Sequence, residues 1–222
     1  MNRPTIRMFP SRLKRLVKQR LLEPLRRARW QRDLARWPAT ADGRRLLHIG
    51  CGEVVGKDFI NLDARPFPHV HIVSRNLFRL QRIPDRSLDM VYMCHVLEHV
   101  PRSQIIPTLR EMARVLKPGG ILRLSVPDFD LLLALYEASG QDLRAIAPAL
   151  MGGQDYPFNF HYAVFNRAAL AEALAASGLS DIHEWFPHAC EFHDFEDWAS
   201  RRIEHQGRDF PISLNLEAVR NA

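Results

Sequence analysis

The stretch LLHIGCGEVVGKDFINLD, residues 46–63, decides the fold of this chain. A run of apolar residues ends in the turn Gly50–Gly52, and a second apolar run ends in Asp63, eleven residues after Gly52. A strand, a glycine turn and a second strand ending in an acid are typical of the start of a nucleotide-binding sheet. Two features are unusual. His48 stands two residues before the first glycine, and the connection to Asp63 is too short for a full helix.

Further apolar runs predict strands and helices in alternation. We expect strands at residues 69–74, 87–96, 121–127, 181–186 and 212–218, and helices at 105–116, 128–139 and 167–177. Asp128 and Asn166 can cap two of these helices, because a short polar side chain accepts from the free N–H groups of a first turn. The alternation predicts an α/β, Rossmann-like fold, with a mostly parallel seven-stranded sheet and helices on both of its faces.

Glycines and polar residues gather where the predicted strands end. In open parallel sheets, ligands bind in the crevice beyond the carboxyl ends of the strands. The residues Gly50–Gly52, Asp63, Asn76, His95 and Asp128 all fall at such ends. We therefore expect them to line one crevice.

The composition indicates a globular protein of one main domain. A chain of 222 residues can bury a sizeable core. Its three cysteines, Cys51, Cys94 and Cys190, are too scattered for a disulfide framework or a zinc cluster and fit a reducing cytoplasm. No run approaches the roughly 18 apolar residues of a membrane-spanning helix, and no apolar core of a secretory signal follows the basic N-terminus. We therefore expect a cytoplasmic protein.

Positive charge is concentrated at the N-terminus. Residues 1–36 hold twelve Lys and Arg against two acidic residues, a net charge of +10, whereas the rest of the chain carries −4. Leucines recur here at helical spacing, which predicts a helix that Ser11 can cap and that Pro24 kinks or ends. We therefore divide the chain into a basic amphipathic helical extension, residues 1–40, and a main domain, residues 41–222.

Three partners fit this extension. An anionic membrane would attract an amphipathic basic helix, which would place the protein peripherally at the inner face of the membrane. The apolar stripe could instead pack on the body of the protein or on a second subunit. RNA is a third partner, although the acidic main domain argues against a nucleic-acid-binding face across it. The sequence gives no indication of the oligomeric state.

Three segments together carry a family resemblance. They are LHIGCG, IPDRSLDMVYMCHVLEHV and LREMARVLKPGGILRLSVPD, and from about Arg45 to Phe186 the chain resembles class I S-adenosylmethionine-dependent methyltransferases. With NFHYAVFNRAAL and ISLNLEA included, the chain also resembles a subgroup of small bacterial methyltransferases linked to cell-surface polysaccharide synthesis. The resemblance implies a methyltransferase domain over residues 41–222, with a lid at about 128–165.

The resemblance also implies roles for individual residues. S-adenosylmethionine would be bound by Gly50, Cys51, Gly52, Asp63, Asn76, Leu77 and His95. Glycines let the backbone approach a ligand where a Cβ atom would clash, and Asp63 would accept the ribose hydroxyls. His48 replaces an acid that commonly steadies the glycine loop or the cofactor's ammonium group. Methyl transfer needs mainly alignment of donor and acceptor, and His161, His95 and Asp128 are the candidate bases for a hydroxyl acceptor.

The motif HVLEH, residues 95–99, has rival interpretations. It matches the H-x-x-E-H pattern of some zinc peptidases, but it follows an apolar strand rather than lying inside a long helix. Glu98, His99 and His161 could hold a divalent ion, as in some RNA 2′-O-methyltransferases. The favoured interpretation is that Glu98 and His99 orient the following helix. We therefore expect no metal, and we expect turnover to survive a chelator.

The function that follows is methyl transfer from S-adenosylmethionine to a sugar or another small or lipid-linked acceptor, in surface polysaccharide synthesis. Two alternatives remain. One is an RNA methyltransferase, which the basic N-terminus would favour. The other is a non-catalytic binding protein of the same fold, because a fold alone does not establish a function.

Overall fold

The computed structural model describes residues 11–76 and 79–221, and the side chains from residue 23 onward within them. Its centre is a seven-stranded sheet with the order β3-β2-β1-β4-β5-β9-β6. The strands are β1 (Leu46–Ile49), β2 (Phe59–Asp63), β3 (Ile72–Val73), β4 (Leu88–Cys94), β5 (Leu116–Pro127), β6 (Leu179–Glu184) and β9 (Ser213–Arg220). Strands β1 to β5 pair in parallel, and β9 runs antiparallel between β5 and β6.

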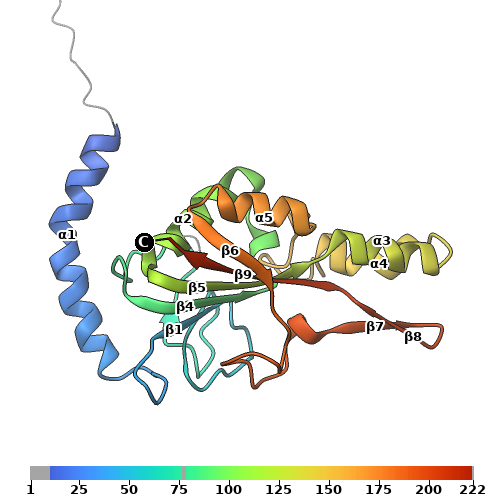
Figure 1. The fold of residues 1–222 in the computed structure, drawn as a ribbon, viewed down its shortest axis with the longest axis horizontal. Coiled ribbons are helices and arrows are strands. Elements are labelled where there is room, and N and C mark those ends of the chain that lie inside the picture. Colours follow the sequence, from blue (N-terminus) through green and yellow to red (C-terminus); the bar gives the residue numbers. More distant parts are fainter. Residues whose placement is uncertain (1–10, 77–78, 222) are drawn as a thin grey trace, which may run out of the picture.

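Five α-helices surround this sheet in the described part of the chain. They are α1 (Ser11–Leu34), α2 (Ile105–Val115), α3 (Phe129–Ala138), α4 (Leu143–Met151) and α5 (Arg167–Ala175). Helices α2 and α5 lie together over one face of the sheet, whereas α3 and α4 extend beyond its edge beside the hairpin of β7 (Arg202–His205) and β8 (Arg208–Pro211) (Figure 1). Helix α1 stands at the opposite side of the molecule.

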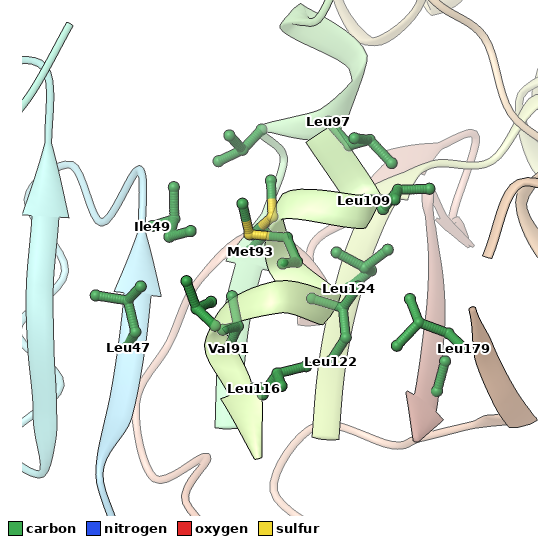
Figure 2. Close-up of a cluster of buried hydrophobic side chains, with 14 of the residues drawn as sticks. Leu47, Ile49, Val91, Met93, Leu97, Leu109, Leu116, Leu122, Leu124 and Leu179 are labelled. Carbon is green, nitrogen blue, oxygen red and sulfur yellow. The ribbon is translucent and has the colours of Figure 1, made fainter. Parts of the chain in front are cut away.

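The main hydrophobic core lies between the sheet and helices α2 and α5. Successive strand residues point to opposite faces, so alternate positions of one strand enter the same core. Leu47 and Ile49 of β1 and Val91 and Met93 of β4 are fully buried in it, and Leu109 of α2 packs over them (Figure 2). The central strands are therefore apolar on both faces, which explains their continuous apolar sequence.

The opposite face of the sheet is covered differently. Its buried cluster contains Leu46, Phe59, Met90 and Tyr92 from the strands, and its cover comes largely from the irregular segment 185–199. The residues of that segment in or against the cluster are Trp185, Cys190, Phe192, Phe195 and Ala199. This differs from the expectation of helices on both faces. The reason is that the short β1–β2 connection leaves no chain for a helix there.

The predicted fold class and the seven-stranded sheet are confirmed. The differences are local. Helix α4 and the β7–β8 hairpin were not predicted, and β3 is only two residues long where residues 69–74 were expected. Helix α1 continues through Pro24 to Leu34, so of the two expected effects of this proline, a kink or an end of the helix, the second does not occur. The Ser11 side chain, expected to cap that helix, lies outside the described residues.

The C-terminal part of α1 is joined to the main domain. Trp30 is 3% exposed and belongs to the main core, and its ring meets that of Trp37 edge-on at a centroid distance of 5.5 Å. An ion pair between Asp33 and Arg82, with 3.0 Å between nitrogen and oxygen, adds a polar contact. This part of the predicted extension therefore packs on the body of the protein.

We predict that Trp30→Ala lowers the free energy of unfolding by about 3–5 kcal/mol, the usual cost of emptying a large buried site. Leu25→Ala on the same helix is the matched control, because Leu25 is 68% exposed and its loss should change stability by less than about 0.5 kcal/mol. Urea unfolding followed by circular dichroism measures both. Equal, small effects would show that α1 does not contribute to the core.

Candidate functional site

A cavity of about 760 Å³ lies at the carboxyl ends of β1 and β4. The loop Gly50–Gly52 and His95 form its sheet side. Residues of α4 and of the segment 152–161 form the lid side, and Trp198 and Arg201 form a third wall. This is the place where a parallel sheet of this topology binds its ligand, and the volume is that of a small-molecule site.

The glycine loop is shaped by backbone hydrogen bonds. Gly50 has a φ of +67°, and a Cβ atom there would lie 2.4 Å from Cγ2 of Val96, so no other residue fits without a shift. The Gly50 N–H donates to the Leu62 carbonyl at 2.7 Å. The Gly52 N–H donates to Oδ2 of Asp63 at 2.8 Å. The loop is therefore fixed against β2, and its backbone faces the cavity.

The predicted cofactor residues fall into two groups. Gly50, Cys51, Gly52 and His95 line the cavity. Asp63 is buried behind the loop, and its second oxygen accepts from the Arg65 N–H at 2.8 Å, whereas Asn76 is exposed. Neither Asp63 nor Asn76 lines the cavity, and Leu77 lies outside the described residues.

The His48 side chain is buried and does not take over the role of the acid that the family resemblance expects at this position. Its ring is 1% exposed and packs among Phe59, Tyr92 and Phe195, stacking on Phe195 at 5.9 Å. Burial lowers the pKa of the His48 imidazole to about 4. His48 is therefore neutral at physiological pH and forms the apolar floor of the cavity next to Gly50.

Asp197 is a site residue that the sequence did not reveal. It lies in the segment covering the second face of the sheet, and it lines the cavity together with His48, Cys94 and His95. Oδ1 accepts from the Ala199 N–H at 2.9 Å and lies 3.4 Å from Nε2 of His193, and Oδ2 accepts from the Tyr92 hydroxyl. Burial would raise the pKa of this carboxyl, but hydrogen bonds from His193 and Tyr92 lower it below its usual value. The site therefore contains a buried carboxylate anion.

His95 is held in a fixed orientation at the end of β4. Its Nε2 lies 2.8 Å from the Ser213 hydroxyl, which itself donates to the Trp198 carbonyl, so the histidine donates to the serine. The ring also packs against the Trp198 indole at 5.6 Å. Burial lowers the pKa of His95 to about 3. Its other nitrogen, Nδ1, therefore carries a lone pair and points toward Glu98, 3.4 Å away.

The other two candidate bases differ in position. His161 lines the cavity from the lid side, and burial lowers its pKa to about 4. Asp128 caps α3 by accepting from the Asp130 N–H at 3.0 Å, as its sequence position predicted, and is not among the cavity-lining residues. Burial raises the pKa of the Asp128 carboxyl. The structure thus brings His95 and His161 together across one cavity and places Asp128 outside it.

Glu98 lies behind these histidines. The carboxyl group is fully buried, and burial raises its pKa to about 8. Oε1 lies 3.4 Å from Nδ1 of His95 and 3.9 Å from Nε2 of His161. The His99 ring meets the His161 ring edge-on at 4.7 Å. The motif at residues 95–99 and the lid therefore converge at a single point.

Arg65 connects the glycine loop with the lid. Its guanidinium lies 5.0 Å from the centre of the Tyr156 ring and 4.6 Å from that of Phe67. Arg65 and Tyr156 both line the cavity. This cation–π contact forms the cavity wall beside Gly52.

Comparison with known proteins identifies the family. The methyltransferase domain family matches residues 22–184, and the chain therefore belongs to it. A probable S-adenosylmethionine-dependent methyltransferase of Mycolicibacterium smegmatis is 31% identical over 156 residues, which cover 62% of this chain and 52% of the relative. A second probable enzyme of this kind, from Mycobacterium tuberculosis, is 29% identical over 158 residues, covering 63% of this chain and 50% of the relative.

The fold comparison agrees. The structure of an S-adenosylmethionine-dependent methyltransferase from Archaeoglobus fulgidus aligns with a TM-score of 0.52 at 18% identity, covering 91% of this chain and 94% of the other. This likeness concerns the fold alone. The chain spans about half the length of the curated relatives it matches. The family implies S-adenosylmethionine as the cofactor.

We predict that His48 makes the protein sensitive to acid. The unfolded chain takes up this proton near pH 6.5 and the folded protein only near pH 4, so stability falls as the pH drops between these values. The loss should reach about 3 kcal/mol at most, because one pKa unit corresponds to about 1.4 kcal/mol. His48→Phe should therefore give a flatter curve of unfolding free energy against pH.

Denaturant unfolding at a series of pH values measures this effect. His183→Gln is the control, because the His183 side chain is half exposed and lies away from the cavity. Parallel curves for the wild-type protein and His48→Phe would contradict the assignment of a buried neutral imidazole.

Proposed function

We propose that this protein transfers a methyl group from S-adenosylmethionine to a hydroxyl of a sugar, carried on a lipid or another small molecule. The observation that carries the proposal is the glycine loop, which only glycine at position 50 can form and which opens directly onto the cavity. Family membership supports the choice of cofactor. Bound there, the cofactor supplies an activated methyl group on its sulfonium.

The glycine-loop side of the cavity fits the methionine portion of this ligand, and Asp63 and Asn76, which do not line the cavity, would meet the ribose and adenine beyond its edge. The Gly50–Gly52 backbone leaves room for close approach, and Asp63 fixes the loop while retaining lone pairs for the ribose hydroxyls. Asn76 and Leu77 would receive the adenine ring. We assign Asp197 to the ammonium group of the methionine portion, because it is a buried anion that lines the same cavity as His48. Asp197 thereby replaces the acid that is absent at position 48.

The acceptor half lies between His95, His161 and Trp198. An indole ring suits the apolar face of a sugar, and Trp198 lines the cavity here. His161 is neutral and can receive the proton of an attacking hydroxyl, whereas His95, fixed by Ser213, positions the acceptor. The chain aligns the two reactants and excludes water, which is the main requirement for methyl transfer.

The surface of the lid favours a lipid-linked acceptor. Several large apolar side chains of α4 and the following segment are about half exposed or more, namely Leu143, Met151, Phe158, Tyr162 and Val164. None of the helices that the structure describes is both long and apolar enough to cross a bilayer. Peripheral contact through the basic residues 1–36 would hold the protein close to a membrane that carries the lipid-linked sugar. We therefore propose that the protein acts at the inner face of the membrane, in surface polysaccharide synthesis.

We predict that the protein binds S-adenosylhomocysteine in calorimetry and that Asp63→Asn and Asp197→Asn each weaken binding at least about tenfold. The reason is that each change removes a charged acceptor worth about 1.5–3 kcal/mol. Asp181→Asn is the matched control, since its side chain is 77% exposed and its positive φ of 49° suits asparagine.

The outcomes separate the alternatives. Absence of binding by the intact protein would favour a non-catalytic descendant of the fold. Binding that Asp63→Asn weakens and Asp197→Asn leaves unchanged would retain the cofactor site and reject the role of Asp197.

We further predict that, with methyl-labelled cofactor and a membrane extract, the label enters the lipid-linked sugar fraction. Removal of residues 1–22 should reduce this labelling several-fold without changing the affinity for S-adenosylhomocysteine, because Trp30 and Asp33 remain in place. Labelling of the RNA fraction would instead establish the nucleic-acid alternative. Labelling that is independent of residues 1–22 would reject the membrane contact.

A further inference from the structure

Four side chains with nitrogen or oxygen lone pairs converge behind the half of the cavity that we assign to the methyl acceptor. Glu98, His99 and His161 each offer one ligand atom, and these three atoms lie within 4.8 Å of one another. Nδ1 of His95 faces the same carboxylate at 3.4 Å. Glu98 is 1% exposed, and within the described chain neither of its carboxylate oxygens has a hydrogen-bond partner.

A buried carboxylate without partners is unfavourable, because burial removes the water that would stabilise its charge. The neighbouring residues in the described chain do not compensate for this loss. His95 donates from Nε2 to Ser213, so its Nδ1 presents a lone pair to Glu98 and not a proton. If Glu98 is protonated, its hydroxyl can donate to Nδ1 of His95. This single proton cannot also satisfy the imidazoles of His99 and His161.

The orientation of the two remaining histidines also suits a cation. Nδ1 of His99 lies 3.0 Å from the Phe160 carbonyl, which can only accept, so Nδ1 carries the proton and Nε2 of the neutral ring has a lone pair. Nε2 of His161 faces Oε1 of Glu98 at 3.9 Å. A backbone bond that fixes the far nitrogen of an imidazole, as at His99, is typical of histidines that bind metals.

The backbone holds the two ligand-bearing segments together. The N–H groups of Tyr162 and Ala163 both donate to the Glu98 carbonyl, at 2.8 and 3.2 Å. The His161 N–H donates to the Met151 carbonyl at 3.1 Å. Residues 98 and 161, far apart in the sequence, are therefore fixed next to each other before any ligand binds.

We propose that Glu98, His99 and His161 bind one divalent transition-metal ion, such as Zn²⁺, with an open coordination position toward the cavity. Two imidazoles and one carboxylate form a donor set that suits such ions. Ligand atoms about 2.1 Å from a tetrahedral ion lie roughly 3.4 Å apart, so small side-chain rotations close the present spacing. His99 and His161 line the cavity, so an oxygen of the acceptor can reach the open position.

This proposal replaces the expectation from the sequence that no metal is needed. It also differs from a peptidase site, because His95, the first histidine of the motif, is engaged with Ser213 and lies outside the three-residue set. A metal there would lower the pKa of a bound acceptor hydroxyl, and His161, as a ligand of the metal, would then not serve as the base. That role rests on the proposed function, whereas the binding of the ion does not.

Metal binding is measured on the full chain after dialysis against EDTA, without cofactor or acceptor. Titration with Co²⁺ followed by visible absorption, and with Zn²⁺ by calorimetry, should each show one site per chain. Glu98→Gln and His161→Ala should each lower the affinity at least tenfold. His183→Ala is the control for adventitious binding to a surface histidine and should bind as the wild-type protein does.

Thermal unfolding with and without Zn²⁺ provides a second readout. An ion that binds the folded state raises the wild-type melting temperature, and Glu98→Gln should abolish that rise. Without metal, Glu98→Gln should melt no lower than the wild-type protein, because it removes a buried unpartnered acid. If Glu98→Gln does not fold, His161→Ala decides the matter.

Two results would overturn the proposal. One is the absence of a one-to-one site for Co²⁺ and Zn²⁺ at millimolar metal. The other is wild-type affinity in both site variants. Binding of S-adenosylhomocysteine, measured on the same samples, reports separately on the proposed function.

Discussion

The connection between β1 and β2 is too short to form a helix, and much of the site follows from this constraint. The Gly52 N–H donates to Asp63 eleven residues later, and the Gly50 N–H donates to Leu62, so the chain passes directly from one strand to the next. The face of the sheet that a helix would have covered carries Leu46, Phe59 and Tyr92. If these side chains were exposed to water, the folded state would be destabilised in proportion to their apolar area.

The irregular segment 185–199 provides the cover. Trp185 donates from its indole nitrogen to the Leu124 carbonyl at 2.9 Å, and Phe195 stacks on His48. The same segment carries Asp197 to the end of β4, where Tyr92 and His193 hold its carboxylate. The burial of neutral His48 and the position of the Asp197 anion both follow from the way segment 185–199 covers this face of the sheet. In the proposed function, Asp197 supplies the negative charge that position 48 lacks.

The sequence predicted the sheet because its strands are continuous apolar runs and its turns contain glycine. It predicted the glycine loop, His95 and His161 because these residues follow strand ends or lie in the lid. Asp197 could not be predicted, since its neighbours in the sequence EFHDFEDW show no periodicity and its partners Tyr92 and His48 are distant. Helix α4 was missed for a local reason, because Pro148 lies within it. The convergence of Glu98 and His161 depends on the backbone bonds from Tyr162 and Ala163, which no sequence motif specifies.

The central claim is that the cavity at the glycine loop holds the cofactor, with Asp197 on its ammonium group. A crystal structure with S-adenosylhomocysteine tests this most directly. The account predicts density along Gly50–Gly52, the ammonium nitrogen within hydrogen-bonding distance of Asp197, and the sulfur facing the space between His95 and His161. Density elsewhere, or an ammonium group held by other residues with Asp197 turned away, would contradict it.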